Sequence, residues 1–370
     1  MVIATESILS IDLDALCENY HKLKARSKSG ACAAVVKADG YGLGAEKICL
    51  ALYKKSCRNF FVAHLEEALV LRKILPDSAE IYVFHGVQQN QAEVFSRNNL
   101  IPVLNHPGQV SLWQEQAKRL NQRLSAILHV DTGMERLGFS KREIFSLHEN
   151  KNQADAISWK YLMSHLACAE QEDNPMNQLQ LQRFQQISAL FPELKTSFAN
   201  SYGLFLNADF HGDLPRPGMA LYGLNPSSAP QSPMKNIVQL NSYILQLRLI
   251  DSISGVGYGA SAVLPSGSRI AVVPVGYADG YLRAASNRAW VSIAKKFAPV
   301  VGRVSMDLLL VDVSSFPENQ LKLGDTVNLI GENISVDQIA EWSGTIGYEV
   351  LTRMGGRYTR RYLSSEGLSA

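Results

Sequence analysis

The segment Ala34-Val-Val-Lys-Ala-Asp-Gly-Tyr-Gly-Leu-Gly44 places a lysine at the point where an apolar run gives way to a glycine-rich loop. The run Ala33–Val36 has the composition of a short buried strand. A helical pattern begins at Ala45, with apolar side chains at positions 45, 48, 49 and 52. A strand, a loop and a helix in this order form the repeating unit of parallel α/β folds. The segment therefore predicts the first βα unit of such a domain.

The same unit recurs as far as residue 225. A helix is predicted over Asp12–Ala25, with Asp12 as its N-cap. Seven further strand candidates follow Ala33–Val36, most of them separated by helical stretches: Phe60–Ala63, Ile81–Phe84, Leu100–Leu104, Ala126–Val130, Ser158–His165, Thr196–Ala199 and Asp213–Arg216. This alternation favours an α/β fold, a (β/α)8 (TIM) barrel. A doubly wound open sheet is the alternative, but its usual glycine-rich fingerprint is absent after the first strand.

The composition changes after Gly223. The Pro- and Ser-rich segment Asn225–Pro233 reads as a linker. Alternating runs without helical periodicity lie beyond it: Ser242–Ile250, Ile270–Val275, Ala289–Ile293, Leu308–Val313 and Thr326–Ile330, with one short helix over Val336–Trp342. They predict a C-terminal, mostly antiparallel β domain. Residues 3–9 could add a strand to either domain. We assign residues 10–230 to the barrel, and residues 1–9 and 231–370 to the β domain.

Composition excludes several classes of protein. In 370 residues, 36 Lys and Arg nearly balance 34 Asp and Glu, so the chain lacks the broad basic surface of a nucleic-acid-binding protein. No apolar run approaches the roughly 18 residues of a membrane span, and the N-terminus shows no export signal. The 5 cysteines have no CxxC spacing, which is typical of reduced thiols in a cytoplasmic protein. No metal site is predicted.

Lys37 is the first candidate for chemistry. Side chains at the carboxyl ends of barrel strands face the active site. An amine at such a position, next to apolar residues, can have a lowered pKa and condense with an aldehyde. Taken alone, Lys37 could equally be a surface lysine before a flexible loop.

The segment resembles the cofactor-lysine motif of alanine racemases, which belong to the barrel-type (fold type III) enzymes that use pyridoxal 5′-phosphate (PLP). Seven further segments resemble that family in the same order along both domains: His129-Val-Asp-Thr-Gly-Met-Glu-Arg-Leu-Gly138, Ser164-His-Leu-Ala167, Ala199-Asn-Ser-Tyr202, Arg216-Pro-Gly-Met-Ala-Leu-Tyr-Gly223, Gly257-Tyr-Gly259, Val275-Gly-Tyr-Ala-Asp-Gly280 and Gly302-Arg-Val-Ser-Met-Asp307. The resemblance implies a homodimer that interconverts L- and D-alanine for the bacterial cell wall, with PLP as cofactor.

The resemblance also assigns the cofactor's contacts. Lys37 forms the Schiff base and is one of two catalytic bases. Tyr41, Asn200, Ser201 and a backbone N–H at Gly218 contact the phosphate. A hydroxyl and N–H groups at the start of the helix expected after Ser201 would suit a dianion.

Arg216 is the most informative residue for the mechanism. The resemblance places it at the pyridine nitrogen of PLP, with His165 packed beside the ring and supporting it. An arginine cannot accept a proton at working pH, so the ring nitrogen stays unprotonated and the ring is a weak electron sink. A weak sink favours rapid reprotonation at the α-carbon over side reactions.

The remaining assignments concern the substrate. Racemisation removes a proton from one face of the α-carbon and delivers one to the other, which two bases do most simply. The resemblance makes Tyr258, from the other subunit, the second base. It places Arg136 at the cofactor's phenolic oxygen and the substrate carboxylate, and it places Met306 and Asp307 near that carboxylate.

Two positions depart from the family pattern. Where many members carry a carbamylated lysine that orients the arginine, this chain has His129. An asparagine, water or bound anion would then orient Arg136. Where many members place a C-terminal tyrosine on the phosphate, our alignment gives Gly356, so we assign that contact to Tyr358.

Three alternatives remain open at this point. One is a serine or broad-specificity racemase of the same family. Another is a related decarboxylase, although the β domain lacks the cysteine-containing segment usual in those enzymes. The third is a PLP-binding carrier without catalysis, which would consist of the barrel alone.

Overall fold

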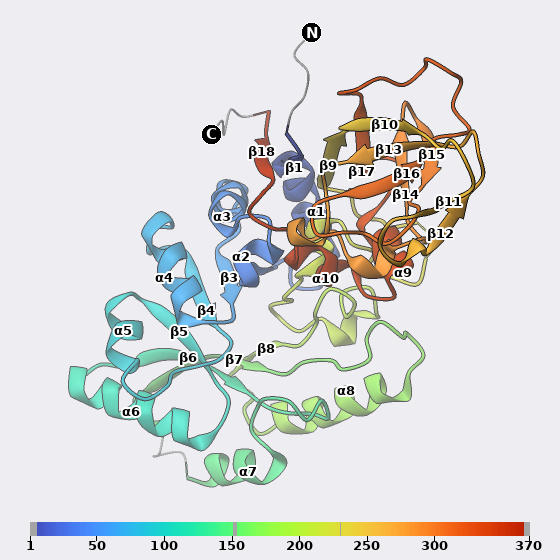
Figure 1. Ribbon diagram of the computed structural model, residues 1–370. Helices are drawn as coiled ribbons and strands as arrows, with labels where there is room; N and C mark the ends of the chain where they lie inside the picture. Colours follow the sequence, from blue (N-terminus) through green and yellow to red (C-terminus); the bar gives the residue numbers. More distant parts are fainter. Residues whose placement is uncertain (1–5, 151–153, 230, 366–370) are drawn as a thin grey trace.

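The computed structural model describes residues 6–150, 154–229 and 231–365. Its first half is a curled parallel sheet with strands in the order of the sequence and helices packed around it (Figure 1). The strands are β2 (Ala34–Val35), β3 (Asn59–Val62), β4 (Glu80–Val83), β5 (Leu100–Leu104), β6 (Leu124–His129), β7 (Ile157–Met163) and β8 (Lys195–Ser197). The helices are α1 (Leu13–Arg26), α2 (Lys37–Tyr41), α3 (Ala45–Lys54), α4 (Leu65–Ile74), α5 (Ala92–Arg97), α6 (Pro107–Leu120), α7 (Lys141–Glu149) and α8 (Pro175–Ser188). The predicted barrel topology is confirmed.

The eighth predicted strand, Asp213–Arg216, is not formed as a strand. Its segment nevertheless lies between β8 and β2, because Arg216 N donates to Ala199 O at 2.9 Å and Ala33 N donates to Pro215 O at 2.9 Å. Val35 N likewise donates to Pro217 O at 3.0 Å. The two prolines have no N–H, so they accept from β2 but cannot donate back and complete a ladder. Residues 213–217, called the closing segment below, therefore close the ring without regular strand pairing.

Side chains fill the interior of the barrel. Val35, Phe61, Tyr82 and Ile127 belong to one buried cluster inside the ring, distinct from the larger core between strands and helices. The strands supply both cores because successive side chains point to opposite faces. With its interior packed, the barrel leaves room for a site only at its ends.

The second half is a set of β-sheets, as predicted. Their strand orders are β15-β14-β17-β9-β1-β18, β10-β13-β16 and β11-β12, and every pair is antiparallel except β1 with β18. The strands are β1 (Ile8–Asp12), β9 (Val238–Tyr243), β10 (Gln246–Leu249), β11 (Ser254–Val256), β12 (Ala262–Leu264), β13 (Arg269–Val273), β14 (Trp290–Ile293), β15 (Lys296–Pro299), β16 (Leu309–Asp312), β17 (Thr326–Ile330) and β18 (Thr359–Leu363). Two helices, α9 (Val336–Ser343) and α10 (Gly347–Thr352), accompany them.

The segment from β1 to α1 connects the two halves of the chain. β1 pairs with β9 and β18 and so joins the C-terminal sheet. It leads directly into α1, whose N-cap is Asp12, as predicted: Ala15 N donates to Asp12 Oδ1 at 2.8 Å.

Within the described residues, no helix is long and apolar enough to cross a membrane, and no group of three His, Cys, Asp or Glu side chains is arranged to hold a metal ion.

Candidate active site

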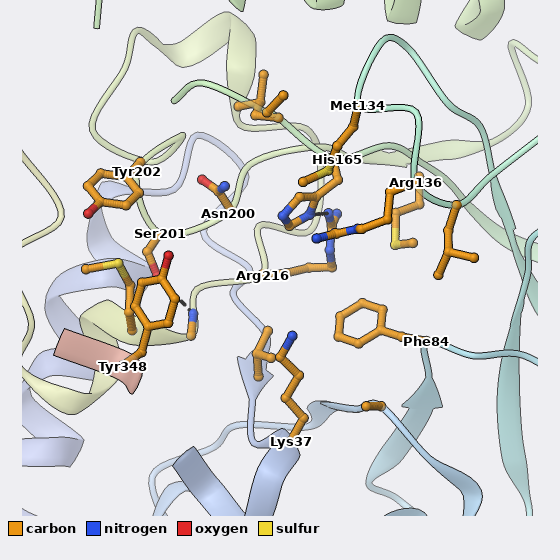
Figure 2. A pocket seen from close by; sticks show the side chains of 18 of the residues that line it. Lys37, Phe84, Met134, Arg136, His165, Asn200, Ser201, Tyr202, Arg216 and Tyr348 are labelled. Atoms are coloured by element: carbon orange, nitrogen blue, oxygen red, sulfur yellow. Dashed lines mark hydrogen bonds between the residues drawn. The ribbon is translucent and has the colours of Figure 1, made fainter. Parts of the chain in front are cut away.

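A cavity of about 650 Å³ lies at the carboxyl ends of the barrel strands. Most of the predicted site residues line it, on elements from β2 to the closing segment (Figure 2). These are Lys37, Tyr41, Arg136, His165, Asn200, Ser201, Arg216 and Gly218. Residues far apart in the sequence thus meet because parallel strands all end at the same rim.

Lys37 follows β2 and points into the cavity towards Arg216 (Figure 2). Its Nζ lies 5.9 Å from the centroid of the Phe84 ring. Burial lowers the pKa of Lys37, and the nearby Arg136 cation lowers it further, while Glu67 opposes the shift. A lowered pKa increases the fraction of neutral amine, which is the form that attacks a carbonyl carbon.

Arg216 is buried, with 2% of its surface exposed, and three groups fix its guanidinium. Nη1 donates to Ser197 Oγ at 2.6 Å, and Nη2 donates to the Ser164 carbonyl at 2.7 Å and lies 3.3 Å from His165 Nδ1. Its Nε–H has no partner among the described residues. Burial lowers the pKa of Arg216 to about 9, so the group remains a cation at neutral pH. The site therefore holds an immobilised cation with one unused, buried donor.

His165 is a neutral acceptor towards Arg216. Burial and then the Arg216 charge hold the pKa of His165 well below its usual range. Because an arginine has only donors, His165 Nδ1 accepts in this contact and carries no proton. The ring proton then sits on Nε2.

The other end of the cavity is rich in neutral donors. Ser201 Oγ accepts from Gly218 N at 2.9 Å and from Ala220 N at 3.2 Å, which leaves its own hydrogen to donate. The Gly218 N–H, expected at a phosphate, is thus directed at Ser201. A Cβ on Gly218 would lie 2.2 Å from Tyr41 Oη, so only glycine leaves room for this tyrosine.

No helix follows Asn200 and Ser201, contrary to the prediction. Residues 201–205 form turns, with only a short 3-10 helix at Ala208–Phe210 beyond them, and Asn200 Oδ1 accepts from Gly203 N at 2.8 Å. The Asn200 amide N–H groups and the Ser201 and Tyr41 hydroxyls can still donate to an anion, without the added field of a helix N-terminus.

Arg136 lies in an exposed loop after β6, and no hydrogen bond or ion pair of its guanidinium is found within the described residues. Asp131 Oδ1 shapes this loop by accepting from Gly133 N at 2.7 Å and from Met134 N at 2.9 Å. The cavity side of Arg136 is therefore available to a ligand.

His129 occupies the position of the lysine that is carbamylated in many family members. Its ring forms a hydrogen bond with Asn105. Its Nδ1 lies 2.7 Å from Asn105 Oδ1, and the Asn105 amide nitrogen donates to Phe84 O and Val103 O. Since Asn105 Oδ1 must accept, His129 Nδ1 donates. Burial lowers the pKa of His129 to about 3, so the ring is neutral.

Four predicted site residues lie outside this cavity. Tyr258 is 70% exposed and Met306 is 52% exposed, while Asp307 pairs with Arg357 at 2.8 Å. Tyr358 is buried in the C-terminal half. Tyr348, on α10, lines the cavity instead, close to Ser201 (Figure 2). Sequence analysis missed Tyr348 because α10, only 6 residues long, was not predicted.

Fold and site together define the class. This is a barrel enzyme with a lysine of lowered pKa after its first strand and a β domain appended to the barrel. Family models for the N-terminal domain of alanine racemase (residues 11–226) and for its C-terminal domain (residues 237–362) match the chain. The chain belongs to the alanine racemase family.

Individual relatives agree along nearly the whole chain. An alanine racemase of Rhodospirillum rubrum is 45% identical and a catabolic alanine racemase of Agrobacterium fabrum is 43% identical, each over 96% of this chain and over 96% and 92% of the relative. The crystal structure of alanine racemase from Bartonella henselae, with covalently bound pyridoxal phosphate, superposes with a TM-score of 0.93 at 39% identity. That comparison covers 97% of this chain and 100% of the other.

Proposed function

We propose that the cavity binds PLP on Lys37 and that the chain interconverts L- and D-alanine. The observation that carries this proposal is the unused Nε–H of Arg216. A buried donor without an acceptor is costly, so this site calls for a ligand with a hydrogen-bond acceptor. An unprotonated pyridine nitrogen is such an acceptor.

The other lining residues fit the same cofactor. The Lys37 amine supports covalent attachment to an aldehyde. Ser201, Asn200 and Tyr41 offer donors for a phosphate, and Tyr348 extends that group. Arg136 would face the phenolic oxygen and the substrate carboxylate. Bound PLP supplies an electron-withdrawing system that acidifies the α-hydrogen of an attached amino acid.

Arg216 is the residue that favours racemisation over other PLP chemistry. Ser197, Ser164 and His165 fix its guanidinium in place. An arginine has only hydrogen-bond donors, so it cannot accept a hydrogen bond from a protonated ring nitrogen and cannot stabilise that form. The weaker electron sink that results favours return of a proton to the α-carbon.

Racemisation also needs a group on each face of that carbon. Lys37 is the base on one face. We assign the other to Tyr258 of a second subunit, because Tyr258 is exposed and lies outside its own chain's cavity. The enzyme would then be a homodimer with shared sites, with Met306 and Asp307 approaching the substrate from the partner. We also propose that it acts in the cytoplasm, supplying or consuming D-alanine of the cell wall.

The first test is Lys37→Ala. Borohydride should fix a pyridoxyl group on Lys37 of the wild-type enzyme, as located by peptide mapping, and on no residue of the variant. A D-amino-acid oxidase assay with L-alanine should show activity in the wild type only. The same assay with L-serine measures the breadth of specificity. A pyridoxyl label on a different lysine would contradict the assignment.

A further inference from the structure

Five consecutive residues after Lys37 have left-handed backbone conformations. The φ angles of Ala38, Asp39, Gly40, Tyr41 and Gly42 are 53°, 54°, 62°, 57° and 80°. Residues with a side chain adopt this region rarely and usually singly, so such a run persists only where its surroundings hold it. The contacts that hold the run must therefore help to decide where Lys37 points.

One carboxylate holds the start of the run. Glu67 Oε1 accepts from Ala38 N at 2.5 Å, while its Oε2 accepts from Ala63 N at 2.8 Å and from His64 N at 3.1 Å. Ala63 directly follows β3. Both oxygens of Glu67, on the first turn of α4, thus tie the residue after Lys37 to the end of the neighbouring strand.

The C-terminal half holds the end of the run. Arg360 Nη2 donates to the Gly42 carbonyl at 2.9 Å and to the Met354 carbonyl at 3.1 Å. Tyr362 Oη donates to the Leu43 carbonyl at 3.0 Å. Arg360 and Tyr362 lie two residues apart in β18, so their side chains are on the same face of the strand. β18, more than 300 residues away in the sequence, thus contacts the end of the left-handed run and the residue that follows it.

We propose that Glu67, Arg360 and Tyr362 are positioning residues for Lys37: they hold the left-handed run between α4 and β18 and so fix the Lys37 amine in the cavity. None of the three lines the cavity, so they act through the loop rather than on a ligand. The activity measurements below rest on the proposed function, whereas the labelling measurement does not.

Glu67→Gln is the sharpest test because an amide cannot reproduce the contacts of a carboxylate. The single oxygen of a glutamine can accept either from Ala38 N or from the pair Ala63 N and His64 N. The side-chain NH2 group would then face the remaining backbone N–H, and two donors cannot form a hydrogen bond. Displacement of a reacting group by about 1 Å can cost about 100-fold in rate. We expect kcat/KM for alanine to fall about 10- to 100-fold, mainly through kcat. The matched control is Glu66→Gln, which changes an exposed carboxylate at the adjacent position of α4 and should have wild-type kinetics.

A second measurement uses the apoenzyme and does not depend on turnover. Because Glu67 raises the pKa of Lys37, the Glu67→Gln change should lower it. The pH dependence of Lys37 labelling by acetic anhydride, followed by mass spectrometry, should therefore shift to lower pH. Arg136, His85 and His165 also interact with Lys37 electrostatically and are unchanged in this variant. A loss of folding alone would not produce this shift.

The β18 contacts are tested by Arg360→Met and by the milder Tyr362→Phe. Arg361→Met is the control, because Arg361 is exposed on the opposite face of β18. Arg360→Met and Tyr362→Phe should each lower kcat/KM several-fold. Combining Arg360→Met with Glu67→Gln should lower it by less than the product of the two effects, since both changes release the same run.

Three results would overturn the proposal: Glu67→Gln kinetics equal to Glu66→Gln, an unchanged Lys37 labelling profile, or fully independent effects of Glu67→Gln and Arg360→Met. A wild-type enzyme without racemase activity would instead refute the proposed function, and the labelling profile would still test the positioning of Lys37.

Discussion

At the scale of single residues, the proposed mechanism gives the buried Arg216 the role of selecting the reaction. Its guanidinium is held by Ser197, Ser164 and His165, and its Nε–H remains for a ligand. None of these three partners is a carboxylate, and an arginine has only donors, so this group cannot share a proton with a ring nitrogen. In the proposed mechanism, the choice between racemisation and other outcomes depends on this residue.

Arg216→Glu should change the reaction and not merely slow it. A carboxylic acid in this place can share a proton with the ring nitrogen and strengthen the electron sink. We expect slower racemisation and a larger share of transamination, measured as pyruvate formed per D-alanine formed. Arg216→Gln, which adds no acid, serves as the control and should lose activity without that increase. An unchanged ratio in Arg216→Glu would show that Arg216 does not face the ring nitrogen.

His129 makes a prediction about stability and pH. Its folded-state pKa of about 3 is far below that of an exposed histidine, about 6.5. Between these values the unfolded chain binds a proton that the folded chain does not. Its contribution to stability is therefore fully present above about pH 6.5 and is lost as pH falls towards 3, by up to about 1.4 kcal/mol per pH unit.

His129→Asn should remove this contribution. An asparagine can still hydrogen-bond to Asn105, so the folded structure should survive with lower stability at neutral pH. The free energy of unfolding, measured with denaturant at several pH values, should depend less steeply on pH between about 6 and 4, by about one proton. An equal slope in variant and wild type would mean that His129 is protonated in the folded state.

At the scale of elements, the periodicity of apolar residues predicted the helices and strands that have a strong repeating pattern. The strands β3 to β8 and the helices α1 and α3 each present a buried face that recurs in the sequence. The predicted strand Ser242–Ile250 is in fact the end of β9 together with β10, because the chain changes sheets near Ile244. Elements as short as β11, β12 and α10 are too brief for a periodic pattern to indicate them.

The residues of the site differ in how far the sequence predicts them. Lys37 follows from a strand that ends at a glycine-rich loop, whereas the roles of Arg136, His165 and Arg216 came from family resemblance. Neither route finds Glu67, Arg360 or Tyr348, because their placement depends on contacts between distant elements. The composition of residues 213–216 predicts a strand, but Pro215 and Pro217 lack the N–H groups that a regular ladder needs.

Gly218, directly after the closing segment, leaves room for Tyr41, which Gly218→Ala should reveal. The added Cβ would lie 2.2 Å from Tyr41 Oη and 3.4 Å from Val35 Cβ. Tyr41 must then leave its place, and we expect the affinity of the apoenzyme for PLP to fall about 10- to 100-fold, as measured by absorbance titration. Gly356→Ala is the control, since nothing lies within 4 Å of its Cβ. Equal affinities in the two variants would exclude the crowding at Gly218.

At the scale of the whole molecule, the cavity of one chain is incomplete for a two-base reaction. Tyr258 lies in the connection of the hairpin formed by β11 and β12, outside the cavity of its own chain. In and next to the same hairpin, Ile253 and Val263 are 74% and 64% exposed, so the hairpin presents apolar side chains as well as Tyr258 to solvent. A second copy of the chain would cover this surface and bring Tyr258 to the partner's Lys37.

Mixing two inactive variants tests this shared site. Lys37→Ala homodimers lack the lysine in both sites, and Tyr258→Phe homodimers lack the second base in both, so each preparation should be nearly inactive. After subunit exchange at equal amounts, about half of the dimers are hybrids. In each hybrid one site receives both changes and the other receives neither. Activity should therefore recover to about a quarter of the wild-type value.

The alternative arrangement predicts a different number. If Lys37 and Tyr258 acted on one cofactor from the same chain, every site in a hybrid would keep one lesion and mixing would restore nothing. Differently tagged chains establish how many hybrids form, and the recovered activity should rise in proportion to that fraction. A hybrid fraction near one half without recovered activity would rule out Tyr258 as the base from the partner, while leaving the assignment of Lys37 intact.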